Sequence, residues 1–154
     1  MSTFSTGERV FLDTSFILNF LFGDERAVVA LEKMIDEGTR FYINPTVIGE
    51  VWFQLMANEY VKKHGRYSTY GIREKVGEIK EAINVADEFF SALPELEVVE
   101  ITERTVEIAR RLIEEHNLLP NDAMILASCI QYGIKKIATF DSDFKKVPNI
   151  ETLP

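Results

Sequence analysis

Residues 10–15 read VFLDTS, so three apolar residues run directly into the carboxylate of Asp13. The apolar run is typical of a strand buried on both faces, as in a parallel sheet. An ionised carboxylate in such a setting is costly unless a helix N-terminus, a cation, or both offset the cost. A short helix is expected over 14–23, with Thr14 or Ser15 as its cap.

Strand-like and helix-like segments alternate along the whole chain. Strands are expected at 8–12, 40–44, 96–101 and 135–140, with an edge strand at 149–153. Helices are expected at 14–23, 24–38, 45–65, 72–93, 103–116 and 121–133, the last capped at Asn121 or Asp122. This alternation predicts parallel crossover units in a layered α/β fold. The 154 residues, without an internal repeat or linker, favour a single domain over 1–154.

Composition narrows the class of protein. With 46% hydrophobic and 27% charged residues, a folded globular chain is expected. The net charge of −8 argues against a broad nucleic-acid binder, although a bound divalent metal would reverse the local sign. The single cysteine, Cys129, allows no internal disulfide and is expected to be a buried apolar residue. We see no signal peptide, and the apolar run at 16–22 is too short to span a bilayer, so a cytoplasmic protein without membrane contact is expected.

Acidic residues recur where strands end or helices begin. Asp13 and Asp141 each follow an expected strand, and they converge if the two strands are neighbours, at the edge where open parallel sheets bind ligands. Asp122 begins the helix that leads into the strand before Asp141, and Glu50 lies in the first turns of a helix that follows a strand. These four acids, with Asp143 close behind, are therefore expected to share one pocket.

Carboxylates packed together repel one another and raise one another's pKa values, and a hard divalent cation relieves that repulsion. Mg²⁺ or Mn²⁺ suits an all-oxygen set, whereas His64 and His116 are isolated and give no zinc cluster. Structural explanations exist for most of these acids taken singly: a helix cap for Asp122, a solvated helix residue for Glu50, and turn formation for Asp141 and Asp143.

These segments together resemble the PIN-domain ribonucleases, and among them the small VapC-type toxins. The matching stretches are VFLDTSFILNFL (10–21), NPTVIGEVW (44–52), LPNDAMILASCIQYGI (119–134) and IATFDSDFKKVPNI (137–150). The resemblance implies an α/β three-layer sandwich around a central, mostly parallel sheet. It also implies a Mg²⁺- or Mn²⁺-dependent endoribonuclease, the toxin of a toxin–antitoxin pair, with RNA as substrate.

The resemblance assigns roles to particular residues. It implies a catalytic set of Asp13, Glu50, Asp122 and Asp141, and metal ligands among Asp13, Asp122, Asp141 and Asp143. The last acid can be either Asp141 or Asp143. Hydroxyls near the metal are expected at Thr14, Ser15 and Thr139.

Residues 58–93 look extended relative to small members of the family, which predicts an altered partner surface or substrate groove. Lys62, Lys63, Arg66 and Lys145 are candidate RNA contacts, with a solvated helix end as the alternative for the first two. Trp52 and Phe53 are expected in the core or an interface rather than against bases. The resemblance further implies a homodimer and an antitoxin partner. An RNA-processing nuclease without an antitoxin, and a non-catalytic RNA-binding module, are the alternatives.

Overall fold

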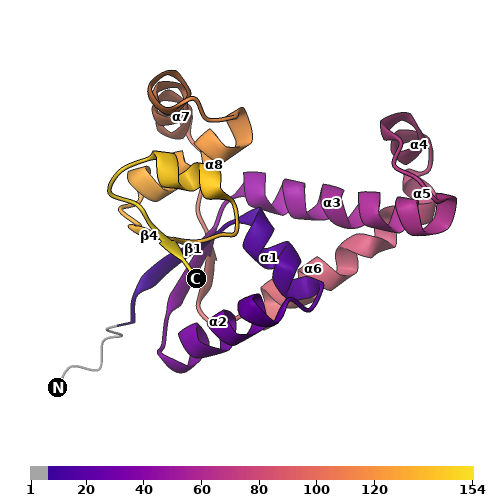
Figure 1. The fold of residues 1–154 in the computed structure, drawn as a ribbon, viewed down its shortest axis with the longest axis horizontal. Helices are drawn as coiled ribbons and strands as arrows, with labels where there is room; N and C mark the ends of the chain where they lie inside the picture. Colours follow the sequence, from indigo (N-terminus) through magenta and orange to yellow (C-terminus); the bar gives the residue numbers. More distant parts are fainter. Residues whose placement is uncertain (1–6) are drawn as a thin grey trace.

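A computed structural model describes residues 7–154 and places five parallel strands in one sheet (Figure 1). The strands are β1 (Arg9–Leu12), β2 (Arg40–Ile43), β3 (Leu96–Val98), β4 (Lys136–Ala138) and β5 (Glu151–Leu153), in the order β3-β2-β1-β4-β5. Every neighbouring pair is parallel, which confirms the α/β class predicted from the alternating segments.

The sheet forms because its central strands are short apolar runs covered on both faces. Val10, Phe11 and Leu12 of β1 are each at most 1% exposed, and Phe41 and Ile43 of β2 are fully buried. Strands buried on both faces read as continuous apolar runs, which is why the stretch before Asp13 predicted a strand in a parallel sheet.

The helices lie in two layers around this sheet. They are α1 (Thr14–Leu21), α2 (Glu25–Asp36), α3 (Pro45–His64), α4 (Thr69–Glu74), α5 (Val76–Ile79), α6 (Asn84–Ala92), α7 (Glu103–His116) and α8 (Pro120–Gln131), with the 3₁₀ helices η1 (Lys80–Ile83) and η2 (Ser142–Lys146). Right-handed crossovers put α1 to α6 on one face, and α7, α8 and η2 on the other. Figure 1 shows α7 and α8 on the side opposite α1 and α2.

The strand order reverses between β1 and β4. Leu12 pairs with Ala138, and the backbone N–H of Asp13 donates to the carbonyl of Ala138 at 3.0 Å. The segments that follow these two strands therefore start side by side at the carboxyl edge of the sheet. In open parallel sheets this reversal point is where ligands bind.

The single long helix predicted over 72–93 is wrong. The chain instead forms α4, α5, η1 and α6, which turn back along the second half of α3. Ile72 and Ile79 are buried there against Ala57, with Met56 and Tyr60 packed around them, in a small apolar cluster separate from the main core. We call α4, α5, η1 and the second half of α3 the arm; Figure 1 shows it projecting away from the sheet.

The structure also tests the expected positions of single residues outside the arm. The side chain of Asp13, rather than Thr14 or Ser15, caps α1. Trp52 and Phe53 are 37% and 41% exposed, so neither lies in the core. Cys129 is buried, as predicted. Within residues 7–154, no helix combines the length and apolarity needed to cross a membrane.

Candidate functional site

Asp13 is buried at the reversal point, and hydroxyl groups hold it in place. It is 3% exposed, and its Oδ2 accepts hydrogen bonds from Ser15 Oγ at 2.6 Å and from Thr139 Oγ1 at 2.7 Å. The same hydroxyls accept from the backbone N–H groups of Phe140 and Asp141, each at 2.9 Å. Burial raises the pKa of Asp13, and these hydrogen bonds partly offset the rise. The network therefore fixes the start of the segment that carries Asp141.

Glu50 joins three helices at the same edge. Its Oε1 accepts from Thr14 Oγ1 at 2.7 Å, and its Oε2 accepts from Asn121 Nδ2 at 2.8 Å. Thr14 begins α1, Glu50 lies in the second turn of α3, and Asn121 lies in the first turn of α8. Both carboxylate oxygens are thus oriented by neutral donors.

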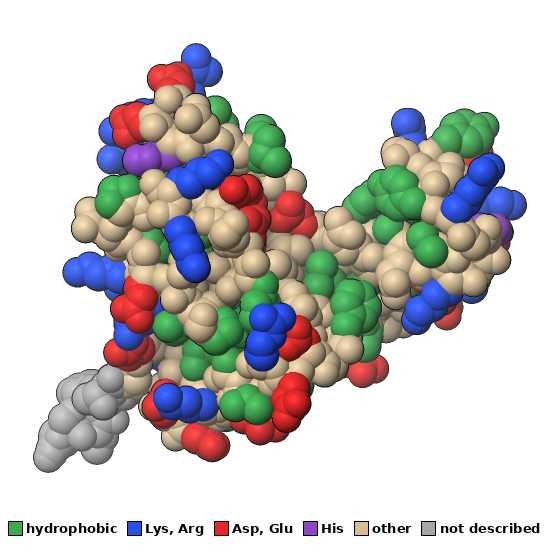
Figure 2. Space-filling model, viewed as in Figure 1, with side chains coloured by type: hydrophobic (Ala, Val, Ile, Leu, Met, Phe, Trp, Pro, Cys, Tyr) green, Lys and Arg blue, Asp and Glu red, His purple; other side chains and the backbone are tan. Residues whose placement is uncertain are grey.

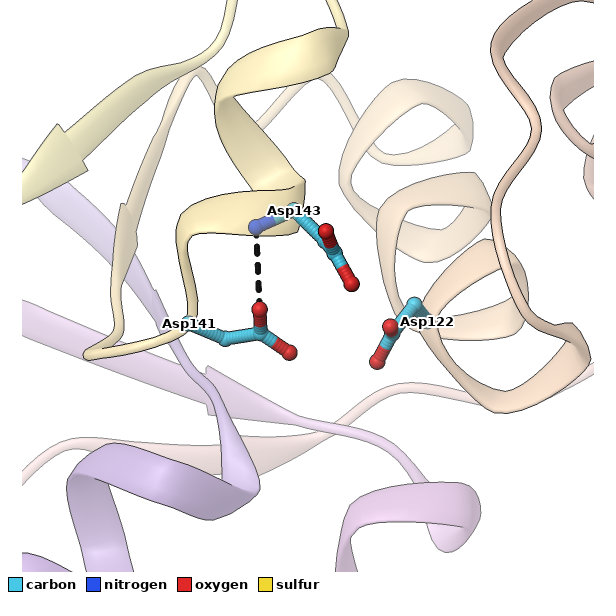
Figure 3. A group of neighbouring side chains, drawn as sticks. All are labelled: Asp122, Asp141 and Asp143. Atoms are coloured by element: carbon cyan, nitrogen blue, oxygen red, sulfur yellow. Dashed lines mark hydrogen bonds between the residues drawn. The ribbon is translucent and has the colours of Figure 1, made fainter.

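Asp122, Asp141 and Asp143 form a compact carboxylate group that we call the acidic trio. One oxygen from each lies within 4.8 Å of the others, a spacing that can hold a metal ion. Figure 3 shows the three side chains converging on a common space from α8 and from the start of η2. Asp141 Oδ1 also accepts the backbone N–H of Asp143 at 2.9 Å, so Asp141 forms the turn and faces the trio at once.

The electrostatics of the trio centre on Asp122. Its pKa is raised to about 6, first by burial and then by the charges of Asp141, Asp13, Glu50 and Asp143. The charges of the four other acids therefore all act on Asp122, although most of their segments lie far apart in sequence. Such mutual repulsion is what a bound cation would relieve.

The structure brings the five predicted acids to one edge of the sheet. Oxygens of Asp122, Asp141 and Asp143 lie within 4.8 Å of one another, while Asp13 accepts hydrogen bonds from Ser15 and Thr139 and Glu50 accepts one from Thr14. The capping role proposed for Asp122 is wrong, as is that for Asn121. Leu119 occupies the cap position of α8, and Pro120 occupies the first helical position. The Asp122 carboxylate is therefore not used as a cap and lies close to Asp141 and Asp143.

The predicted supporting hydroxyls all take part, and two amides were missed. Thr14 contacts Glu50, while Ser15 and Thr139 contact Asp13. Asn121 positions Glu50, and fully buried Asn44 donates to Ser128 Oγ at 2.8 Å, which ties the start of α3 to α8. The sequence contained a signal for both amides. Asn44 directly precedes the helix-starting Pro45 in NPT, and Asn121 directly precedes the candidate acid Asp122 in PNDA.

The candidate RNA contacts divide into two groups: three lie far from the trio, and Lys145 lies on η2, close to it in sequence. Lys62, Lys63 and Arg66 are at the far end of α3, about 18 Å along the helix axis from Glu50. Lys63 Nζ donates to the carbonyl of Glu78 at 2.8 Å, which supports the arm. Lys145 is exposed on η2, while its neighbour Lys146 pairs with Asp143 at 3.4 Å.

Fold and site together define a parallel α/β domain with clustered carboxylates at the strand-order reversal. Comparison with known families agrees, because the PIN-domain family model matches residues 10–150. The chain therefore belongs to the PIN-domain family, as the sequence motifs predicted.

Two curated relatives and several solved structures resemble the chain over nearly its full length. Ribonuclease VapC6 and ribonuclease VapC2 of Methanocaldococcus jannaschii are 31% and 32% identical to it, over 94% of this chain in each case and 95% and 93% of the relatives. VapC20 of Mycobacterium tuberculosis, described as a sarcin-ricin-loop-cleaving toxin, superimposes with a TM-score of 0.64 at 23% identity, covering 94% of this chain and 99% of that one.

A DNA-bound VapBC2 complex of Rickettsia felis also superimposes, with a TM-score of 0.64 at 18% identity and coverage of 94% and 97%. At these identities the solved structures bear on the fold, and they confirm the PIN-like sheet and its flanking helices.

Proposed function

We propose that this protein is a metal-dependent endoribonuclease that hydrolyses RNA phosphodiester bonds, and that it serves as the toxin of a toxin–antitoxin pair. One observation carries the proposal: oxygens of Asp122, Asp141 and Asp143 lie within 4.8 Å of one another at the strand-order reversal. Membership of the PIN-domain family and two relatives named ribonucleases support the choice of reaction.

The residues of the trio fit a hard divalent cation. All three donors are carboxylates, and the pKa of Asp122 is raised to about 6, first by burial and then by the neighbouring carboxylates, whose repulsion a cation would relieve. Oxygen-only ligand sets favour Mg²⁺ or Mn²⁺. When bound, such an ion lowers the pKa of a coordinated water and neutralises charge on the phosphate.

The surrounding residues would position that chemistry. Asp122, Asp141 and Asp143 would hold the ion, and Asp13 would contribute through Oδ1, since the hydroxyls of Ser15 and Thr139 point at Oδ2. Glu50, held by Thr14 and Asn121, would orient the attacking water or accept its proton. Lys145, exposed on η2, would contact a phosphate outside the trio.

Partner and assembly are part of the same proposal. Solved toxin–antitoxin complexes share this fold, which supports an antitoxin as the partner of this chain. Homodimerisation and a cytoplasmic location stay predictions. An adjacent short reading frame for a DNA-binding protein, which co-purifies with this chain and inhibits it, would establish the toxin role.

The direct test is cleavage of single-stranded RNA by purified protein with Mg²⁺ or Mn²⁺. The wild type should cleave, and a chelator should abolish cleavage. Asp122→Asn should be inactive with its circular dichroism spectrum unchanged, because the Asp122 side chain is not used as a helix cap. Cleavage by Asp122→Asn at the wild-type rate would contradict the proposal.

An RNA-processing nuclease of the same chemistry, without an antitoxin, is the second candidate. The arm supports this candidate, because six Lys or Arg in residues 60–80 offer a surface for a dedicated RNA substrate. Cleavage at one defined site in a cellular RNA, with growth unaffected by overexpression, would favour this role over that of a toxin. RNA binding without cleavage at any metal concentration would indicate a non-catalytic module.

A further inference from the structure

A cavity of about 440 Å³ lies along the first turns of α3. Its lining includes Thr46, Gly49, Glu50, Phe53 and Gln54 of α3 and Asn121 of α8. Glu50 and Asn121 are hydrogen-bonded to each other, and Asn121 directly precedes Asp122 of the trio. The cavity therefore shares Glu50 with the acidic edge of the sheet and lies in the size range of ligand pockets.

The cavity belongs to a larger hollow in the surface. In Figure 2 the hollow has the arm on one side and the part formed by α7 and α8 on the other. Acidic side chains lie on the side of α7 and α8. In Figure 1, α3 runs between the two sides. Gly49, Phe53 and Tyr60 share one face of α3 by helical spacing, and Tyr60 packs into the arm. The cavity is thus part of the floor of a groove that joins the trio to the arm.

The side chains of the cavity suit a flat, uncharged ring with polar edges. Phe53 is 41% exposed and offers an aromatic face, and the amides of Gln54 and Asn121 can each donate and accept hydrogen bonds. Asn121 gives its Nδ2 to Glu50, which fixes the orientation of its amide. Neither Lys nor Arg lines the cavity, so it is a poor site for a phosphate.

We propose that this cavity is a subsite for one unpaired nucleobase, that of the nucleotide flanking the phosphodiester held at the trio. The inference rests on the proposed ribonuclease function and deepens it. Phe53 stacks on the base, which tolerates any base, while Gln54 and Asn121 bind its edge and discriminate among bases. Cleavage then shows a base preference at one position next to the cut.

The groove continues toward a basic surface on the arm. Residues 60–80 contain six Lys or Arg and two Glu, whereas the whole chain carries a net charge of −8. Tyr67 and Tyr70 there are 57% and 74% exposed. A single strand leaving the cavity along the groove meets positive charge and aromatic faces, the combination that binds single-stranded nucleic acid.

Gly49→Leu and Ala92→Leu form a matched pair of variants. A Cβ at Gly49 would meet nothing within 4 Å, so a side chain at this position extends into the cavity. Ala92→Leu adds the same side chain at an exposed position of α6, outside the cavity and outside residues 60–80. Phe53→Ala and Phe22→Ala form a second pair, since Phe22, the C-cap residue of α1, is 58% exposed and does not line the cavity.

Binding is measured by anisotropy of fluorescent single-stranded RNA hexamers, with Mn²⁺ present and Asp122→Asn as the background to prevent cleavage. Gly49→Leu and Phe53→Ala should each weaken binding by about fivefold or more, the effect of losing one stacked base. Ala92→Leu and Phe22→Ala should leave it unchanged. In the active background, Gln54→Ala should flatten the base preference in a random RNA pool.

The outcomes separate this inference from the ribonuclease proposal. Wild-type cleavage with equal affinities for all four variants would leave the nuclease standing and overturn the subsite. Failure of the hexamers to bind would also overturn the subsite, while metal-dependent cleavage decides the nuclease independently. If Gly49→Leu and Phe53→Ala change the sedimentation coefficient but not RNA affinity, a second copy covers the cavity and the subsite is wrong.

Discussion

Thr139 donates a hydrogen bond of 2.7 Å to Asp13, which joins the ends of two neighbouring strands through a buried carboxylate. The same hydroxyl accepts the backbone N–H of Asp141 at 2.9 Å, so one oxygen connects Asp13 to the loop that carries two acids of the trio. The position of that loop therefore depends on a side-chain contact as well as on the sheet.

Thr139→Val removes this hydroxyl and keeps the shape of the side chain. We expect the free energy of unfolding near neutral pH to fall by about 1.5–3 kcal/mol, because a hydrogen bond to a buried carboxylate is lost. Urea denaturation gives the measurement. Thr139→Ser, which keeps the hydroxyl, should retain most of the stability, and equal losses in both variants would contradict the role of the hydrogen bond.

Asp122→Asn should stabilise the metal-free protein in a pH-dependent way. The pKa of Asp122 is about 6 in the folded protein, against an ordinary value of 3.8 that applies to the unfolded chain. Between about pH 4 and pH 6 the folded protein therefore keeps a proton on Asp122 that the unfolded chain releases. The stability from this proton is lost as the pH passes through about 6. Asparagine avoids the resulting charge repulsion.

The two units of pKa shift correspond to at most about 3 kcal/mol, and solvent screening of this partly exposed group reduces the gain to about 1 kcal/mol near pH 7. Thermal unfolding in chelator measures the gain, which should shrink toward about pH 4. A gain of the same size at both pH values would show that ionisation of Asp122 is not its source.

Mn²⁺ affinity should identify which acids hold the ion. Asp122→Asn, Asp141→Asn and Asp143→Asn should each weaken binding by about tenfold or more in calorimetry, because each removes one oxygen ligand. Asp36→Asn, at the exposed end of α2, is the control. If Asp141→Asn or Asp143→Asn binds like the control, the other acid is the principal last ligand.

Glu50→Gln should separate catalysis from metal binding. Glu50 lies outside the trio and is held by Thr14 and Asn121, so Mn²⁺ affinity should change less than in the trio variants. Cleavage should fall by about 100-fold or more if Glu50 handles a proton of the attacking water. A flat pH–rate profile in Glu50→Gln, where the wild type shows an acidic limb, would support that role; unchanged activity would remove it.

The sequence predicted the sheet and its edge because these follow from local signals. The apolar run before Asp13 and the proline after Asn44 mark a strand end and a helix start without knowledge of distant residues. The order of strands β1 and β4 then brings the acids to one edge, which the motif spacing anticipated.

The arm was predicted incorrectly because tertiary packing outweighed periodicity. Apolar spacing over 72–93 suggests one helix, yet Ile72 and Ile79 pack in the small cluster against Ala57 of α3, whereas Ala86 and Phe89 of α6 pack in the main core. The segment is divided at η1 because its two halves bury their apolar faces in different places. Gly71 and Gly77 weaken helix propensity there. Likewise, sequence placed five acids at one edge but did not predict the hydrogen bonds that hold Asp13 and Glu50, since these join residues far apart in the chain.

The trio draws two of its members from the segment after β4, whereas Asp122 comes from a helix that precedes that strand. A fragment truncated after α8 keeps Asp13, Glu50 and Asp122 but lacks the two carboxylates that complete the group. Cutting the chain between α8 and β4 therefore dismantles the trio even though three of the five acids remain on one fragment.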